Sequence, residues 1–583
     1  MKTTPENTVP MVNPGLSSIK EILDLTIPEM LERSLRFYKD LPAMRACHDG
    51  SWYTLTYQQF SDEVDNLARG LAAQGINPGD RIGILSENRP EWGIAYFASI
   101  KIGAVNVPLD ALLKPTELRH IIRESGAKCL IASNKFAGDF IGGEVEVQKL
   151  ELLINMDEQS SGSENSSMHV MSFEELKESG RRYDIEFPKC DKHDTVALLY
   201  TSGTTGQSKG VMLSHHNILA DICAILQMIY FYTSDNFLSV LPIHHAFECT
   251  CGFLAPVTIG ASITYARSLK SKEILDDIKG NQCTIMLGVP LLFEKMHQGL
   301  IRAIGKKPRH TRMIFSTSLG AVKFLKKSFG YNAGGTIFKS LREKAGLISL
   351  RLFVSGGAPL PPEVGEAFEL LGINFIQGYG LTETSPVLSL NPFERPKQAS
   401  IGIPIINSEL KIDNPDDNGI GELLARGPVI MKGYYKNPRA TEEVMTPDGW
   451  FKTGDSAYVD EDGYYYIAGR VKNLIVTRAG KNIYPEEIET LLVKSPYIAE
   501  ALVMGRSTDD KQLVSDVEAV IVPDYEYLEL QAELSGKEFS EEELNSIIKI
   551  EITRLCADIA DYKRIKSFRL REDEFIKTST KKI

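Results

Sequence analysis

Residues 199–211 read Leu-Tyr-Thr-Ser-Gly-Thr-Thr-Gly-Gln-Ser-Lys-Gly-Val, an apolar run that enters a loop of small residues closed by one lysine. Glycine and hydroxyl residues fill eight of the ten positions 201–210. Glycines let the backbone approach a ligand closely, backbone N–H groups and hydroxyls donate hydrogen bonds, and a lysine adds positive charge. We therefore predict a polyphosphate-binding loop between two strands. A solvated turn between the same strands, without a ligand, is the simpler alternative.

The spacing within this loop differs from the P-loop of common nucleoside triphosphatases. That loop has four residues between its glycines and a Ser or Thr directly after its lysine. Here two residues separate Gly203 from Gly206, and Gly210 follows Lys209. The spacing argues against a phosphotransferase, which would release ADP, but leaves phosphate binding in place.

Composition and charge narrow the class of protein. The chain has 583 residues, 43% hydrophobic and 24% charged, so several globular domains are expected. A net charge of −12 argues against nucleic acid as a partner. The first residues are polar and no run of about 18 apolar residues occurs, so we expect a cytoplasmic protein without a membrane span. The eight scattered cysteines argue against a zinc site and for reduced thiols.

Apolar runs and amphipathic stretches alternate along most of the chain. Phe60, Val64, Leu67 and Leu71 recur at helical spacing, and residues 81–85 form an apolar run typical of a buried strand. Such alternation predicts an α/β fold with a largely parallel, doubly covered sheet. We expect residues 1–20 to be disordered.

The pattern changes twice toward the C-terminus. Short strands separated by turn residues begin at residue 409, and a separate α+β pattern begins at residue 474. We predict a large N-terminal α/β domain over residues 21–470 that ends in a small β region. A smaller, mobile α+β domain follows over residues 471–583, with a hinge at residues 470–473.

Loops with chemically active residues follow several predicted strands. They occupy residues 201–209, 355–358 and 378–384. Open parallel sheets bind ligands at the carboxyl ends of their strands, so these loops are expected to share one site.

Residues 300–350 are basic and helical in pattern. The basic residues are Lys306, Lys307, Arg309, Arg312, Lys323, Lys326 and Lys327. A solvated helical face is the simpler interpretation of these residues. A surface that binds anionic lipid or an acidic carrier protein is the more specific interpretation.

Five motifs together resemble the adenylate-forming superfamily, which includes acyl-CoA synthetases, peptide-synthetase adenylation domains and luciferase. They occur in the family order and are Tyr200-Thr-Ser-Gly-Thr-Thr-Gly-x-x-Lys209-Gly, Gln377-Gly-Tyr-Gly-Leu-Thr-Glu383-Thr, Thr453-Gly-Asp455, Gly469-Arg470-x-Lys472 and Pro485-x-Glu-Ile-Glu489. Length, the Leu241-Pro-Ile-His-His245-Ala-Phe-Glu248 segment, the basic region and Ser355-Gly-Gly-Ala-Pro-Leu360 are most similar to long-chain fatty acid–CoA ligases. The resemblance implies ATP, Mg²⁺ and CoA as reactants or cofactors, an acyl-adenylate intermediate, and AMP and pyrophosphate as products.

The resemblance also implies roles for individual residues. The phosphate loop comprises Thr201, Ser202, Gly203, Thr204, Thr205, Gly206 and Lys209. The adenine and α-phosphate residues are Gly357, Ala358, Gly378, Tyr379, Gly380 and Thr382, with Glu383 as the Mg²⁺ ligand. Asp455 and Arg470 would bind the ribose and phosphate, and Lys472 would mark the hinge. On the substrate side, His245 would lie near the acyl carboxylate, Gly288 near the acyl chain and Gly480 near the pantetheine arm.

The C-terminal tail carries the catalytic lysine in this superfamily. Here the tail reads Ile576-Lys-Thr-Ser-Thr-Lys-Lys-Ile583, and alignment of its threonines assigns the role to Lys582. Lys581 stands where glycine is common, which makes it the competing candidate. Ser208 likewise replaces a common proline in the phosphate loop without removing a hydrogen-bond donor.

Several of these residues have simpler interpretations. Asp455 is also consistent with a turn cap, Glu383 with a surface charge, His245 with a core position, and Arg470 and Lys472 with ordinary linker charge. The favoured function is a long-chain fatty acid–CoA ligase, with peripheral membrane contact as a further expectation. Transfer of the acyl group to an acyl carrier protein is the first alternative, followed by a phosphotransferase and a catalytically silent nucleotide-binding module.

Overall fold

The chain forms two compact units, which we describe one at a time. One comprises Met1–Glu409 with Ala425–Phe451, and the other comprises Leu410–Leu424 with Lys452–Ile583. The computed structural model describes residues 19–141, 145, 149–157, 168–201, 208–477, 481–507, 514–535 and 539–575. Most of the segment predicted to be disordered, residues 1–18, lies outside this part, and helix α1 (Ile19–Leu23) begins directly after it.

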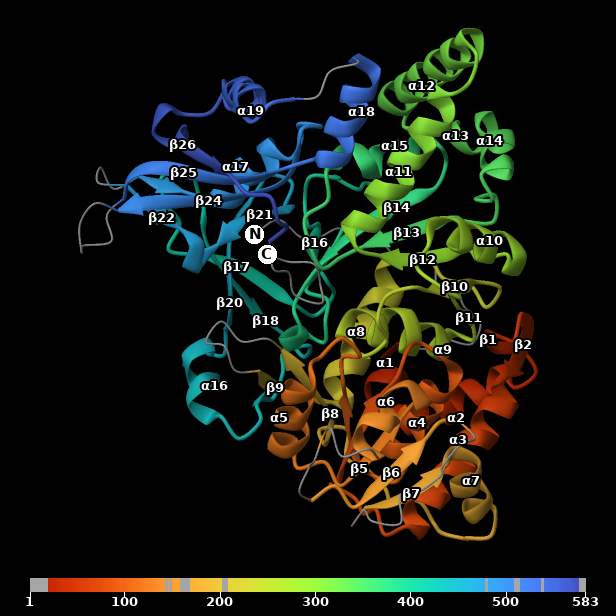
Figure 1. The fold of residues 1–583 in the computed structure, drawn as a ribbon. Helices are drawn as coiled ribbons and strands as arrows, with labels where there is room; N and C mark the ends of the chain where they lie inside the picture. The colour runs from red at the N-terminus through yellow and green to blue at the C-terminus, as the bar shows by residue number, and fades with distance from the viewer. Residues whose placement is uncertain are drawn as a thin grey trace. The chain divides into compact units, whose positions relative to one another are not determined.

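A nine-stranded sheet forms one half of the first unit (Figure 1). Its strands, in spatial order, are β16 (Ile403–Pro404), β15 (Ser389–Leu390), β14 (Asn374–Tyr379), β13 (Leu352–Ser355), β12 (Ile285–Gly288), β10 (Asn236–Ser239), β11 (Ser262–Tyr265), β1 (Pro42–His48) and β2 (Ser51–Thr56). Pairing is parallel from β14 across to β1, and antiparallel at both ends of the sheet. The parallel strands confirm the predicted α/β fold class.

An eight-stranded sheet forms the other half. Its strands are β19 (Gly433–Tyr434), β9 (Lys209–Ser214), β8 (Thr195–Thr201), β4 (Val105–Pro108), β3 (Arg81–Leu85), β5 (Cys129–Ala132), β6 (Leu152–Asn155) and β7 (His169–Ser172). Pairing is parallel from β7 to β8, and β9 and β19 are antiparallel. The antiparallel pair β8–β9 brackets the predicted phosphate loop.

Helices cover both sheets. Those of the first unit beyond α1 are α2 (Ile27–Tyr38), α3 (Tyr57–Ala73), α4 (Pro90–Lys101), α5 (Pro115–Ser125), α6 (Asn134–Ile141), α7 (Phe173–Arg181), α8 (His215–Met228), the π-helix η1 (Glu248–Leu254), α9 (Ala255–Ile259), α10 (Ser271–Asn281), α11 (Pro290–Gly305), α12 (Arg309–Phe329), α13 (Gly334–Ile337), α14 (Lys339–Lys344), α15 (Pro362–Leu370) and α16 (Pro438–Val444). Within the described ranges, none of the helices combines the length and apolar character needed to cross a bilayer.

Two helices show how sequence dictates position. Helix α3 begins where the Thr56 hydroxyl accepts a hydrogen bond from the backbone N–H of Gln59, a capping box. Its predicted apolar face, which includes Phe60 and Leu71, is fully buried. Helix α4 is apolar on almost every side and is buried along nearly its whole length, as expected for a helix enclosed by other elements. Trp92 stacks on Tyr96 there, with ring centroids 5.2 Å apart.

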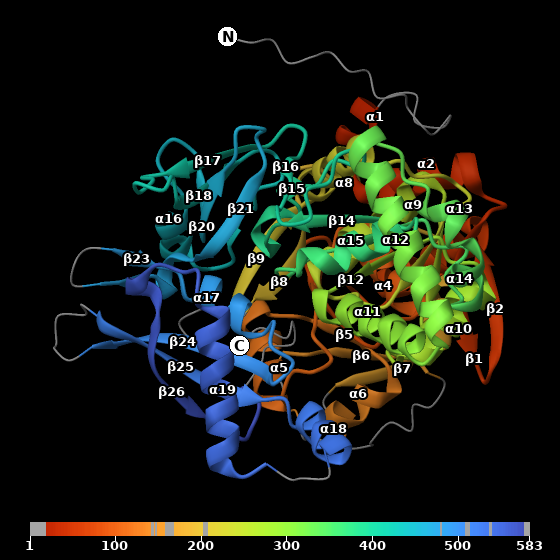
Figure 2. The same ribbon diagram turned by 90° about the horizontal axis from the view of Figure 1, so that it is seen from above.

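The second unit contains the small β region and an α+β core (Figure 2). The short strands form a four-stranded sheet of β17 (Glu409–Asp413), β18 (Gly421–Arg426), β20 (Phe451–Val459) and β21 (Tyr465–Arg470), followed by the pair β22 (Ile475–Val476) and β23 (Asn482–Ile483). The core comprises β24 (Ile498–Ser507), β25 (Val514–Pro523), β26 (Ile565–Leu570), α17 (Pro485–Leu492), α18 (Tyr525–Ser535) and α19 (Glu541–Leu555). By compactness the residues from Lys452 onward group with this unit. The hinge at 470–473 concerns a motion and stays a prediction.

Candidate functional site

Four neighbouring parallel strands of the nine-stranded sheet end at one edge. In the register of β12, β13 and β14, Gly288 lies opposite Ser355 and Ser355 lies opposite Gln377, while β10 pairs with β12 on the other side. The loops after these strands therefore start side by side, as Figure 1 shows for β12, β13 and β14. Predicted site residues His245, Gly288, Gly357, Ala358, Gly378, Tyr379, Gly380, Thr382 and Glu383 all lie at or beyond these strand ends.

Two glycines in these loops have conformations that other residues do not tolerate. Gly357 has a φ of 86°, in the left-handed region, and it is exposed together with Ala358. A Cβ at Gly380 would overlap the carbonyl oxygen of Pro386. Gly357 leaves the surface open beside the loop that carries Tyr379. Gly380 allows that loop to turn tightly. Both features suit a surface that a flat ring approaches.

The predicted phosphate loop joins two antiparallel strands. Thr201 at the end of β8 pairs with Lys209 at the start of β9, so Lys209 stands at the mouth of the loop. Ser202, Gly203, Thr204, Thr205 and Gly206 lie outside the described residues, and their phosphate contacts stay predictions. The flanking strands are as the apolar pattern predicts.

Tyr434 links the phosphate-loop lysine to the predicted metal ligand. Its hydroxyl donates a hydrogen bond of 2.8 Å to Oε1 of Glu383, and Nζ of Lys209 lies 5.0 Å from the centroid of its ring. Burial, and then the charge of Glu383, hold the pKa of Tyr434 well above its ordinary value, so its hydroxyl keeps its proton. The backbone N–H of Met431 donates to the carbonyl of Glu383, which fixes the same turn. Sequence reasoning missed Tyr434, although it lies in the aromatic Gly433-Tyr-Tyr435 segment.

Replacing Tyr434 with Phe is expected to lower the rate of the ATP-dependent step by about 10- to 100-fold, the range for losing a hydrogen bond to a charged group. The ring over Lys209 stays, so the loss reports the Glu383 contact alone. Tyr435→Phe is the matched control, because its side chain packs on an apolar cluster instead. Equal rates for the two variants in a pyrophosphate-release assay would contradict a role for the Tyr434 hydroxyl.

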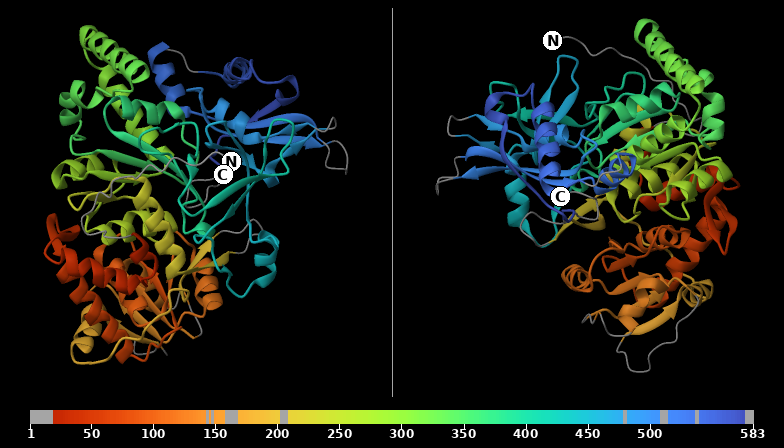
Figure 3. Two further views of the ribbon diagram at one scale, coloured as in Figure 1. Left: turned by 180° about the vertical axis from the view of Figure 1, so that it is seen from behind. Right: turned by 45° about the horizontal axis from the view of Figure 1, so that its top comes forward.

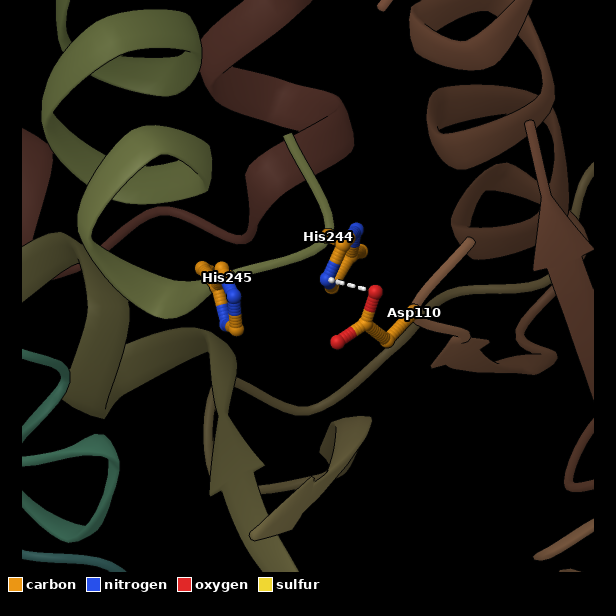
Figure 4. Close-up of side chains that lie close together, drawn as sticks. All are labelled: Asp110, His244 and His245. Atoms are coloured by element: carbon orange, nitrogen blue, oxygen red, sulfur yellow. Dashed lines mark ion pairs between the residues drawn. The ribbon is translucent and has the colours of Figure 1, made fainter. Parts of the chain in front are cut away.

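His245 lies in a group with buried His244 and with Asp110, and both His245 and Asp110 are partly buried (Figure 4). The two imidazole centroids are 4.3 Å apart, and Nε2 of His244 lies 3.4 Å from Oδ1 of Asp110. Burial, and then His244, lower the pKa of His245 to about 4, so this ring is neutral at physiological pH. Among the described residues, nothing hydrogen-bonds the buried Nε2 of His245. A ligand that reaches this ring could therefore form a hydrogen bond with Nε2.

The same three side chains are of the types that bind metal ions, and their ligand atoms lie within 4.8 Å of one another. Because this group contains no cysteine, cysteine spacing in the sequence does not reveal it. Nε2 of His244 faces the Asp110 carboxylate, and the ring of His244 packs beside the ring of His245.

Asn88 and Glu248 fix the loop that carries His245. The Asn88 amide donates to the carbonyl of Leu241 at 2.6 Å, and its oxygen accepts from the backbone N–H of Ile243 at 3.0 Å. Ser239 donates to Oε1 of Glu248 at 2.6 Å. Sequence reasoning missed Asn88, since it lies 155 residues before the loop it binds.

Glu248 makes stability depend on pH. Burial raises its pKa from the usual 4.5 to about 8. The folded state therefore holds this proton more tightly than the unfolded chain, so the stability from Glu248 is full below pH 4.5 and is lost as pH rises to about 8. We expect this one carboxyl to lower the free energy of unfolding by up to about 1.4 kcal/mol per pH unit in that window.

Glu248→Gln is expected to flatten this dependence, measured as the midpoint of thermal unfolding at pH 6, 7 and 8. The exposed Glu366→Gln serves as control and should follow the wild type. Parallel midpoint curves for wild type and Glu248→Gln would show that Glu248 is ionised in the folded protein.

In the second unit, buried Asp455 forms an ion pair with Arg470, whose side chain is partly exposed. They are opposite each other on β20 and β21, with Nε of Arg470 3.0 Å from Oδ1 of Asp455, and Asp455 is 5% exposed. Glu486, in the predicted Pro485 motif, accepts hydrogen bonds from the backbone N–H of Arg470 and from the side chain of Asn473. Lys472 lies in the turn Val471–Asn473. Gly480, Lys581 and Lys582 lie outside the described residues.

The family model of AMP-binding enzymes matches residues 31–435 of the chain. The chain belongs to the AMP-binding enzyme family. The resemblance derived from its five motifs is thereby confirmed, because the match contains both the phosphate-loop motif and the Glu383 motif.

Curated AMP-binding relatives are similar over most of the chain. The chloroplastic long-chain-fatty-acid–[acyl-carrier-protein] ligase AEE15 of Arabidopsis thaliana is 28% identical, covering 91% of this chain and 80% of the relative. The long-chain-fatty-acid–CoA ligase FadD15 of Mycobacterium bovis is 31% identical, covering 78% of this chain and 76% of the relative.

The fold of this family member is shared with a solved ligase. The crystal structure of the anthranilate CoA ligase AuaEII in complex with anthranoyl-AMP superposes with a TM-score of 0.74 at 24% identity, covering 97% of each chain. The likeness supports the α/β architecture and the smaller C-terminal unit. At 24% identity the likeness concerns the fold, not the substrate or the acceptor.

Proposed function

We propose that this AMP-binding enzyme activates a long-chain fatty acid with ATP and transfers the acyl group to CoA. In the first half-reaction an oxygen of the carboxylate attacks the α-phosphate, and the bond to pyrophosphate breaks. In the second, the CoA thiol attacks the acyl carbon, the bond to AMP breaks, and the thiol proton is released. The observation that carries the proposal is the series of contacts from Lys209 through Tyr434 to Glu383. Glu383 and His245 both follow strands that end at one edge of the nine-stranded sheet.

The first half-reaction brings two anions together, which explains the residue types. Lys209 would offset charge on the departing pyrophosphate, and Thr382 would donate to the α-phosphate. Neutral His245, whose pKa is lowered to about 4, would donate a hydrogen bond from its ring N–H to the acyl carboxylate. Gly357, Ala358 and Tyr379 would hold the adenine. Asp455, paired with Arg470, suits the two ribose hydroxyls as acceptor.

The residues present suit Mg²⁺. Glu383 offers a carboxylate held at Oε1 by Tyr434, and in the described part of the chain no residue hydrogen-bonds its Oε2. Mg²⁺ favours sites of one or two carboxylates completed by phosphate oxygens, where it spreads negative charge.

Acyl chain length is tested by pyrophosphate release across saturated acids of increasing length. We expect kcat/KM to rise from short to long acids, as each buried CH₂ group adds about 0.8 kcal/mol of binding. A maximum with short or aromatic acids would overturn the fatty-acid assignment while leaving adenylation intact.

An acyl carrier protein is the alternative acceptor, and the relative AEE15 carries that name. Purified enzyme with ATP, Mg²⁺ and palmitate would receive either CoA or phosphopantetheinylated carrier protein. We expect the thioester on CoA. A thioester found on the carrier alone would replace CoA as the acceptor.

A further inference from the structure

Helix α12 presents large apolar side chains to solvent. In this helix, every residue of which the structure describes, only Val322 is buried. Met313, Ile314, Phe324 and Phe329 are 62%, 64%, 63% and 72% exposed. Four such side chains on one 21-residue helix are more than the scattered apolar residues of an ordinary protein surface. Exposed apolar side chains gathered in this way are typical of an interaction surface.

Helical spacing places Met313 and Phe324 on the outward side of the helix, and the ring of Phe329 at the helix end lies 6.4 Å from that of Phe324. Val322 and Phe315, whose ring lies 5.4 Å from that of Phe338, mark the inward face. Met313 and Phe324, separated by eleven residues or three turns, fall on the opposite face. Both views of Figure 3 show α12, in green, standing at the outer edge of the helices around β13 and β14. The apolar stripe formed by Met313 and Phe324 thus faces away from the first unit.

The charged side chains beside the apolar stripe are all Lys or Arg. Residues 300–331 contain eight Lys and Arg residues and no Asp or Glu, although the whole chain carries −12. Arg309, Arg312, Lys323 and Lys327 recur at helical spacing along one side of Met313 and Phe324. Within the described ranges, only Lys326 of the eight forms an ion pair, with Glu369 at 3.0 Å. An apolar stripe bordered by cations is typical of a helix that lies in the surface of an anionic bilayer.

We propose that α12, with the end of α11, docks this protein on an anionic lipid surface. Phe324, Phe329 and Met313 enter the boundary between headgroups and acyl chains, and the flanking lysines and arginines contact lipid phosphates. An acidic carrier protein would satisfy the cations but leave the convex apolar stripe in water, so the bilayer fits both features. The docking goes beyond the ligase reaction and needs neither ATP nor acid.

Vesicle flotation of the full-length protein, without substrates, tests the proposal. Wild type is expected to bind phosphatidylcholine vesicles that contain phosphatidylglycerol, to bind pure phosphatidylcholine far less, and to dissociate as salt is raised. Met313→Asp with Phe324→Asp should weaken binding at least about 20-fold. Lys323→Gln with Lys327→Gln should weaken it about 25-fold, since each cation near such a surface contributes roughly fivefold.

Matched controls separate the surface from general effects of charge. Leu112→Asp with Leu269→Asp removes two equally exposed apolar residues elsewhere, and Lys270→Gln with Lys272→Gln removes two exposed cations. Both controls should bind as the wild type does, and thermal unfolding midpoints confirm folding of every variant. Equal binding to anionic and neutral vesicles, or undiminished binding by the α12 variants, would overturn the proposal. So would α12 variants that lose affinity for an acyl carrier protein but keep it for vesicles.

Discussion

Glu383→Gln is expected to slow acyl-adenylate formation by about 1,000-fold, the upper range for removing one charge-stabilising group. The amide keeps the shape of the side chain and can still accept from Tyr434, but it no longer attracts a divalent cation. The Mg²⁺ concentration for half-maximal rate should rise as well. The measurement is single-turnover formation of acyl-adenylate at increasing Mg²⁺.

The exposed Glu366→Gln is the control for loss of one carboxylate near the same sheet and should retain the wild-type rate. If Glu383→Gln kept full rate and Mg²⁺ dependence, Glu383 would be a surface charge that only anchors Tyr434, and the metal assignment would fail.

Lys582→Ala is expected to lower acyl-adenylate formation by at least about 100-fold and to spare thioester formation from supplied acyl-adenylate. A lysine that meets the negative charge developing at the α-phosphate matters only in the first half-reaction. The two rates are measured separately, with ATP and palmitate in one assay and synthetic palmitoyl-AMP with CoA in the other.

Lys581→Ala is the internal control, because it removes the same charge one residue earlier in the tail. We expect it to retain most of the adenylation rate. If Lys581→Ala lost activity and Lys582→Ala did not, the tail alignment would be wrong by one position. Loss of both half-reactions in Lys582→Ala would point to a defect of the whole second unit instead.

Local sequence patterns predict helices and strands well, because the start and the buried face of an element depend on residues close together in the sequence. The α3 face follows from Phe60, Val64, Leu67 and Leu71, and its start follows from the Thr56 cap. In the second unit the helical spacing of Ile548, Ile552, Leu555 and Ile559 predicts a helix that continues to residue 560, whereas α19 ends at Leu555. Ile559 still packs on the core from beyond the helix end, so burial alone did not mark the boundary.

Contacts between distant segments were not predictable in the same way. Tyr434 reaches Glu383 across 51 residues, and Asn88 reaches the His245 loop across 155. The positions of His244 and His245 in the sequence do not indicate that Asp110 lies beside them, because Asp110 follows β4 of the other sheet. The motifs thus identified the residues most directly tied to chemistry. The side chains that orient them became visible only when the strands were placed.

The central claim, that a carboxylate takes AMP from ATP, is tested most directly with palmitate labelled with ¹⁸O in its carboxylate. Attack of the carboxylate on the α-phosphate leaves one carboxylate oxygen on phosphorus when the thiol releases AMP. Mass spectrometry of the products should therefore find AMP that carries one ¹⁸O, in equal amount to thioester and with unlabelled pyrophosphate. Label in inorganic phosphate, together with ADP, would show phosphoryl transfer to the acid and would contradict the account.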